Sequence, residues 1–241
     1  MIMNKILSLL LMALCITSCS TIGSKDLSGP EVSKYYTVKP FTSIDISNAI
    51  DAEFVQTQGD SLSVLVTTTE PVMKDMVVET KGNQLLIGYN SPVFIGGNRP
   101  DIHVIIKGSH LNEINVGGAS VLNIKTLKSD NLTAKVSGAS GLNINSLLAT
   151  RLNAEASGAS GLKLNGKVLE ASFNSHGASK VDAYKLQSEQ TEVNASGASD
   201  IRCYASVSIT GEASGASNVN YVGSPKNANV SASGASDVKS R

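Results

Sequence analysis

The chain has 241 residues, and its 20 basic and 20 acidic side chains give a formal net charge of zero. No block of like charge interrupts the sequence, which argues against a nucleic-acid-binding protein or one that adheres to an anionic membrane surface. Aromatic residues make up only 4% of the chain and tryptophan is absent, so the aromatic platforms common in carbohydrate-binding sites are scarce.

The first 18 residues predict a lipoprotein signal peptide. Lys5 precedes an apolar run that ends at Ile16, and Cys19 follows shortly after it. A positive start and a short apolar run are typical of a secretory signal, because a membrane span needs about 20 apolar residues. The cysteine resembles that of a bacterial lipobox, although serine precedes it where glycine or alanine is commoner. We therefore expect lipidation of Cys19.

Lipidation would anchor the exported chain to the bacterial outer membrane, on its periplasmic or its surface face. An ordinary secretory peptide is the alternative. Residues 19–34 are rich in small and polar residues and predict a flexible tether. Cys203 would then be the one cysteine of the mature chain besides Cys19, and its place among apolar residues predicts a small core side chain.

Residues 35–116 predict irregular strands. Short apolar runs at 44–46, 62–66, 85–87 and 102–106 are separated by glycine-containing turn signals. A short helical turn is expected near residues 70–76. We expect this segment to form the first, divergent turns of the fold described next, with a separate small domain as the alternative.

Residues 117–241 contain seven copies of Gly-Ala-Ser, and successive copies are 20, 20, 19, 20, 18 and 19 residues apart. The glycines are Gly118, Gly138, Gly158, Gly177, Gly197, Gly215 and Gly234, and the serines are Ser120, Ser140, Ser160, Ser179, Ser199, Ser217 and Ser236. A fixed period near 20 indicates a repeat architecture, in which each unit packs on its neighbours.

Apolar and polar residues alternate on both sides of each motif. Four residues after the glycines stand Leu122, Leu142, Leu162, Val181, Ile201, Val219 and Val238. Alternation with period two predicts strands with one buried face. The sequence therefore predicts an all-β parallel β-helix (β-solenoid) with about 19–20 residues per turn. Each motif should form a corner, with glycine and serine inward, alanine outward, and the serine hydroxyls bonded to one another or to the backbone.

The chain resembles the putative auto-transporter adhesin head (head GIN) domain family from about residue 35 to the C-terminus. The resemblance rests on the lipobox, on residues 41–46, 58–60 and 85–87, and on Ser-Gly-Ala-Ser repeats such as the one at 137–145. It implies a secreted or lipid-anchored, right-handed parallel β-helix. The resemblance implies no catalytic residues in this chain.

An extended polar repeat face is suited to multivalent contact with a long partner. We therefore expect a non-enzymatic cell-envelope protein with an adhesin-like or structural role, whose partner is a glycan or an extracellular protein. Tyr184 and Tyr204 fall on outward positions of neighbouring turns with Arg202 near them, and these three residues form the candidate binding face. No cofactor is expected, and no residue spacing matches a metal site.

The alternative is a polysaccharide lyase or hydrolase on the same fold. Its candidate charges form two outward columns, one with Asp182, Arg202 and Lys239, the other with Lys180, Asp200 and Asp237. A further prediction is an end-to-end homodimer, because the last turn of a solenoid leaves strand edges unpaired.

Overall fold

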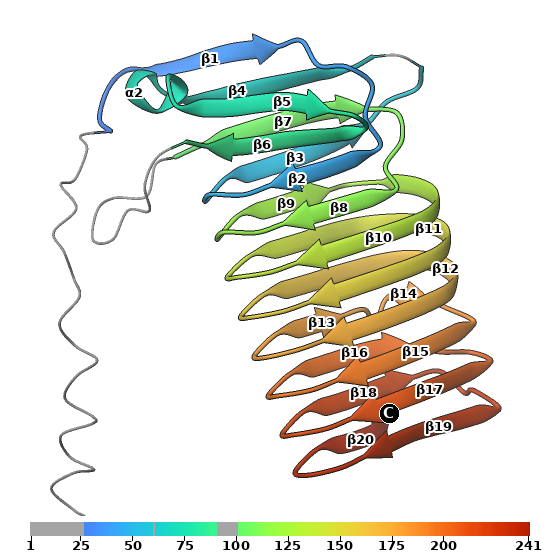
Figure 1. Ribbon diagram of the computed structural model, residues 1–241. Coiled ribbons are helices and arrows are strands. Elements are labelled where there is room, and N and C mark those ends of the chain that lie inside the picture. The colour runs from blue at the N-terminus through green and yellow to red at the C-terminus, as the bar shows by residue number, and fades with distance from the viewer. Residues whose placement is uncertain (1–26, 60, 91–100) are drawn as a thin grey trace, which may run out of the picture. The chain divides into compact units, whose positions relative to one another are not determined.

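Two sheets of stacked strands face each other in the computed structural model, which describes residues 27–59, 61–90 and 101–241 (Figure 1). We call them the front sheet and the back sheet. The described residues belong to one compact unit. Strands β11 (Gly141–Ala156) and β12 (Gly161–Ser175) run through both sheets, so the 20 strands of the described residues form one hydrogen-bonded network.

In the repeats, the front sheet contains the strands that lead into the corners. In spatial order its strands are β5 (Met76–Lys81), β6 (Gln84–Tyr89), β2 (Ser43–Ile46), β8 (Glu113–Val116), the end of β10 (Leu127–Val136), the ends of β11 and β12, β15 (Gln190–Ala195), β17 (Ser208–Ala213) and β19 (Asn227–Ala232).

In the repeats, the back sheet contains the strands that follow the corners. In spatial order its strands are β1 (Glu31–Tyr36), β4 (Ser63–Thr69), β7 (His103–Gly108), β3 (Asp51–Gln56), β9 (Val121–Ile124), the starts of β11 and β12, β13 (Lys180–Asp182), β16 (Asp200–Tyr204), β18 (Asn218–Val222) and β20 (Asp237–Ser240). A short ladder that includes β14 (Leu186–Gln187) closes the edge opposite the corners.

Parallel register between turns confirms the predicted parallel β-solenoid. One back-sheet column holds Val121, Gly141, Gly161, Lys180, Asp200, Asn218 and Asp237. Its steps of 20, 20, 19, 20, 18 and 19 residues are the periods of the Gly-Ala-Ser motif. Each turn therefore pairs with its neighbours strand for strand.

The core lies between the two sheets and consists of columns of apolar side chains. The predicted inward column is buried from Leu122 to Val219 and half-buried at Val238, in the last described turn. Cys203 belongs to the neighbouring column and is fully buried as a free thiol. Burial raises the pKa of this thiol to about 12, so Cys203 acts as a small apolar core residue.

The corner glycines are exposed, which shows that the predicted inward orientation was wrong. Gly158 has a φ of +74°, in the left-handed region that favours glycine. The amide of the next residue, Ala159, donates to the carbonyl oxygen of Gly138 at 2.8 Å. A Cβ atom added to Gly158 would lie 2.8 Å from that same oxygen. Glycine is required here because successive turns approach each other too closely for a side chain.

The corner serines connect each turn to the backbone of the turn before it. Ser179 is buried, and its hydroxyl donates to the carbonyl oxygen of Ala156 at 2.9 Å. Ser160, Ser199, Ser217 and Ser236 make the equivalent bond. Ser140 is buried too, but its hydroxyl has no hydrogen-bond partner among the described residues. The contacts of this column from one turn to the next thus go to the backbone.

The first corner of the stack lies far upstream of the repeats. At Asn48 and Ala49 φ is positive, and the amide of Ala49 donates to the carbonyl oxygen of Gly118 at 2.8 Å. Ser120 Oγ accepts from the amide of Ile50 at 3.1 Å. Strands β2 and β3 are therefore a solenoid turn that stacks directly on β8 and β9, within the segment expected to be irregular.

Spatial order and chain order differ at this end of the fold. The chain leaves the solenoid after β3, and β6 and β7 return to stack on the outer side of β2 and β3 (Figure 1). Strands β1, β4 and β5 run antiparallel to their neighbours, and helix α2 (Glu70–Met73) lies between β4 and β5, where a helical turn was expected. The antiparallel strands end the parallel stack.

Replacing Gly158 with valine should lower the free energy of unfolding by about 1–3 kcal/mol, because the side chain would collide with the backbone of Gly138. Urea unfolding of the full chain measures this loss. Gly161→Val is the matched control, since nothing lies within 4 Å of a Cβ at Gly161. Its effect should stay within about 0.5 kcal/mol. Equal losses in both variants would contradict the close approach at the corner.

Candidate functional site

A shallow groove of about 470 Å³ crosses the front sheet from β10 to β17. Two outward columns line it. The first holds Asn131, Arg151, Glu170, Gln190 and Ser208, and the second holds Thr133, Asn153, Ser172, Glu192 and Thr210. With strands ~4.8 Å apart, the four intervals from the first to the last of these turns span roughly 19 Å. The groove is therefore a polar site that extends over several turns.

The groove carries almost no net charge. Arg151 Nε contacts Glu170 Oε2 at 2.8 Å across adjacent turns, and Glu192 is the remaining charged residue of the lining. Both partners of the ion pair are about half exposed, so the pair contributes little stability. The remaining polar groups are amides and hydroxyls, which both donate and accept hydrogen bonds. Such a surface complements a neutral, hydroxyl-rich chain better than a polyanion.

The predicted binding face lies on the other side of the molecule, in β16 and in the turn that follows β13. Tyr184 and Tyr204 are half-buried. The Tyr184 hydroxyl is buried without a hydrogen-bond partner among the described residues. Arg202 Nε pairs with Asp200 Oδ2 at 3.0 Å. These residues do lie on neighbouring turns, and their role in binding stays a prediction.

The two predicted charge columns are in register on the back sheet. Asp182 lies opposite Arg202, and Lys180 lies opposite Asp200. Arg202 contacts Asp200 and Lys239 contacts Asp237, each pair within a single strand. Asp200, Arg202, Asp237 and Lys239 line a shallow pocket of about 300 Å³, in which each of the two acids is paired with a base of its own strand.

Two carboxylates approach each other on the front sheet beyond the groove. Glu113 accepts hydrogen bonds from Ser43 Oγ at 3.3 Å and from Asn115 Nδ2 at 3.2 Å. Asp45 lies opposite Asn115 on the adjacent strand. Burial and, to a lesser extent, the charge of Glu113 raise the pKa of the Asp45 carboxyl. The environment of Asp45 therefore favours the protonated carboxyl more than bulk water does.

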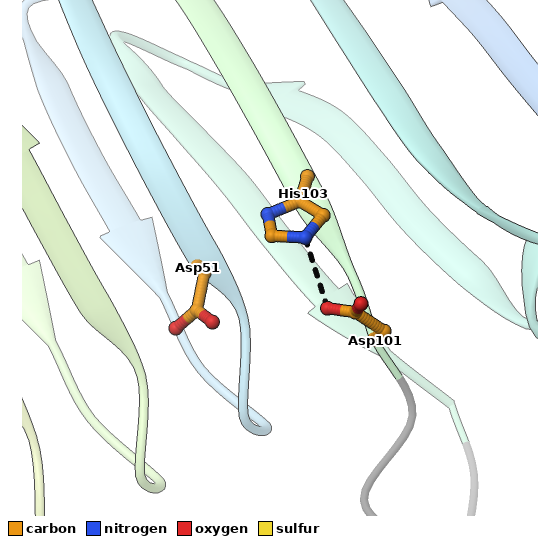
Figure 2. Close-up of side chains that lie close together, drawn as sticks. All are labelled: Asp51, Asp101 and His103. Carbon is orange, nitrogen blue, oxygen red and sulfur yellow. Dashed lines mark ion pairs between the residues drawn. The ribbon is translucent and has the colours of Figure 1, made fainter.

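One group of side chains in the described parts of the chain has the donor atoms and spacing to hold a metal ion. It consists of Asp51, Asp101 and His103, whose ligand atoms lie within 4.8 Å of one another (Figure 2). No spacing in the sequence predicts it, because Asp51 stands 50 residues before Asp101.

The sequence pattern of the family described as "putative auto-transporter adhesin, head GIN domain" matches residues 40–225. The chain belongs to this family.

Solved structures agree with this assignment. A putative adhesin from Bacteroides fragilis is 25% identical, with a TM-score of 0.84 over 89% of this chain and 99% of that one. A putative lipid binding protein from Parabacteroides distasonis is 18% identical, with a TM-score of 0.70 over 88% and 97%. A putative adhesin from Parabacteroides merdae is 15% identical, with a TM-score of 0.66 over 88% and 97%. The last two show the fold alone. Comparison with curated proteins finds no significant match.

Cys19 of this head GIN protein lies outside the described residues, as do the predicted signal peptide (residues 1–18) and the first part of the predicted tether. Among the residues that the structure describes, no helix has the length and apolar character to cross a membrane.

Sequence reasoning missed the groove of this head GIN domain for a specific reason. It followed the aromatic residues that come after the motifs, whereas the groove residues precede the motifs. The available signal was the alternation upstream of each glycine, which places polar residues such as Asn153 and Ser172 outward. Whether that outward face is flat or hollowed depends on how the strands bend, and alternation alone does not reveal this.

Replacing Asp45 with asparagine should raise the midpoint of thermal unfolding at pH 7 and have less effect near pH 3. The folded-state pKa of Asp45 lies above the ordinary value of 3.8, so the native state binds this proton more tightly than the unfolded state. The stability gained from this tighter proton binding is fully present below the ordinary pKa of 3.8 and is lost as the pH rises through the folded-state pKa. Asparagine does not ionise, so Asp45→Asn avoids the free-energy cost of a charged, partly buried side chain at pH 7.

Thermal unfolding of the parent and of Asp45→Asn between pH 3 and pH 7 measures this difference. Asp130→Asn, at an exposed position, is the control. A difference between parent and Asp45→Asn that does not change with pH would contradict the raised pKa.

Proposed function

We propose that this chain is a non-enzymatic, adhesin-like protein of the bacterial cell envelope whose front-sheet groove binds a neutral, extended glycan. The observation that carries the proposal is the groove itself, in which amide and hydroxyl side chains recur once per turn over several turns. A polymer laid along the solenoid would meet similar donors and acceptors at each turn, so that many weak contacts add up. Membership of an adhesin-head family supports the same role.

The charges of the groove support a neutral ligand. Arg151 is already paired with Glu170, and Glu192 leaves the lining with one excess negative charge. A polyanion would be repelled by this excess and would have to break the ion pair to reach the guanidinium. A neutral polysaccharide or an uncharged peptide segment would not meet either cost.

We propose further that lipid on Cys19 anchors the protein to the outer membrane. The support is the apolar run up to Ile16 and the small residues before the cysteine. Anchoring at one end would leave the groove free for a partner in the surrounding space. End-to-end dimerisation through β19 and β20 stays a prediction, as does binding at Tyr184, Arg202 and Tyr204.

A polysaccharide-active enzyme is the second candidate, and one observation favours it. Asp45 and Glu113 are neighbouring carboxyl groups, and Asp45 has a raised pKa. Glycoside hydrolysis uses a pair of carboxyl groups, one of them protonated. The pair lies outside the groove lining, however, so a glycan held along the groove would be bound away from it.

A glycan array probed with the full chain tests the proposal, with product release from the same glycans followed in parallel. We expect saturable binding to neutral glycans and no release of oligosaccharides. Asn153→Ala should weaken binding roughly 2- to 10-fold, the loss of about one hydrogen bond. Ser172→Trp should abolish binding by filling the groove.

Asn143→Ala is the matched control, because Asn143 lies in the same strand as Asn153 but faces outward from the back sheet. Its affinity for the glycan should equal that of the parent. Equal weakening by Asn143→Ala and Asn153→Ala would place the ligand elsewhere. Oligosaccharide release that is lost in Asp45→Asn would establish the enzyme instead.

A further inference from the structure

We propose that Asp51, Asp101 and His103 form a binding site for one divalent transition-metal ion, with Zn²⁺ as the representative case. The site lies on the outer surface of the back sheet, near the antiparallel end of the stack. It is separate from the groove and does not depend on the proposed glycan.

The register of the back sheet brings the three side chains together. Asp51, the first residue of β3, lies opposite His103, the first residue of β7. Residues opposite each other on adjacent strands point to the same face of a sheet, and Asp101, two residues before His103, shares that face. His103 Nε2 lies 3.0 Å from Asp101 Oδ1, and Figure 2 shows the Asp51 carboxylate on the neighbouring strand beside this pair.

Backbone hydrogen bonds hold the three residues in place. The amide of Asp51 donates to the carbonyl oxygen of Ile102 at 3.0 Å, which joins β3 to the residue between the other two ligands. Thr68 Oγ1 donates to the backbone oxygen of Asp101 at 2.6 Å. The ligands therefore come from backbone segments that are tied to one another, and only side-chain rotation is needed to adjust them.

The distances suit a metal ion after a small rotation. Bonds from Zn²⁺ to imidazole nitrogen and carboxylate oxygen are about 2.0–2.2 Å long and tetrahedrally arranged, so two ligand atoms of one ion lie roughly 3.4 Å apart. The ligand atoms here lie within 4.8 Å of one another, and Asp101 and His103 are exposed and free to rotate. An ion would take the place of the direct contact between His103 and Asp101.

The donor set favours a transition metal over Ca²⁺ or Mg²⁺. One imidazole nitrogen and two carboxylate oxygens are typical ligands of Zn²⁺, whereas Ca²⁺ and Mg²⁺ prefer oxygen ligands alone. Two carboxylates also balance the charge of one divalent cation.

Titration calorimetry with ZnCl₂ tests the site in the full chain carrying Cys15→Ser and Cys19→Ser. The remaining cysteine, Cys203, is buried, so no accessible thiol competes for the metal. We expect one saturable equivalent of Zn²⁺, a rise in the midpoint of thermal unfolding that EDTA reverses, and no saturable binding of Ca²⁺ or Mg²⁺. With Co²⁺ as the probe, visible absorption should report the bound imidazole.

Two variants and a control locate the ion. His103→Asn and Asp51→Asn should each lower the affinity for Zn²⁺ at least 10-fold. His110→Asn should leave the affinity unchanged, because His110 is an exposed histidine outside the group. Circular dichroism verifies that each variant keeps its fold. Absence of saturable Zn²⁺ binding, or unchanged affinity in His103→Asn, would overturn the proposal, and neither result would bear on glycan binding.

Discussion

The close approach of successive corner glycines is the constraint on which the rest of the structure depends. At Gly158, Gly177 and Gly197 the glycine carbonyl oxygen of the preceding turn lies 2.8–2.9 Å from the position that a Cβ atom would occupy. The alanine amide after each of these glycines donates to that same oxygen. A larger residue would separate the turns at the corner. The motif thus sets the register between turns at the corner edge, and the strands on either side of the corner keep that register.

Register at the corner explains why the outward face can serve as a binding surface. Apolar columns between the sheets hold the turns together, so outward residues are free to differ without loss of the core. Arg151, Glu170 and Gln190 occupy one outward column because the inward residues beside them are aligned. A ligand along the groove would therefore meet side chains whose spacing is fixed by backbone pairing.

Local pattern was sufficient to predict the repeating part of the fold. Alternation and period placed Leu142, Leu162 and Val181 in one buried column, and the structure confirms this. The predicted alternation of inward and outward residues failed at the glycines, because a residue with positive φ does not continue the alternation of a strand. Sequence also could not show that β2 lies between β6 and β8, that β3 lies between β7 and β9, or that Asp51 meets His103. Those contacts come from non-local pairing without a repeated motif.

Hydrogen–deuterium exchange at the corner amides tests most directly whether the corners lock successive turns together. The amides of Ala159, Ala178 and Ala198 donate to the preceding glycine carbonyl at 2.7–2.8 Å, although these alanines are exposed. If the corners lock the stack, these amides exchange as slowly as those of the central strands β11 and β12. Exchange as fast as in the hairpin turn between β5 and β6 would show that the corners open independently and would contradict the account.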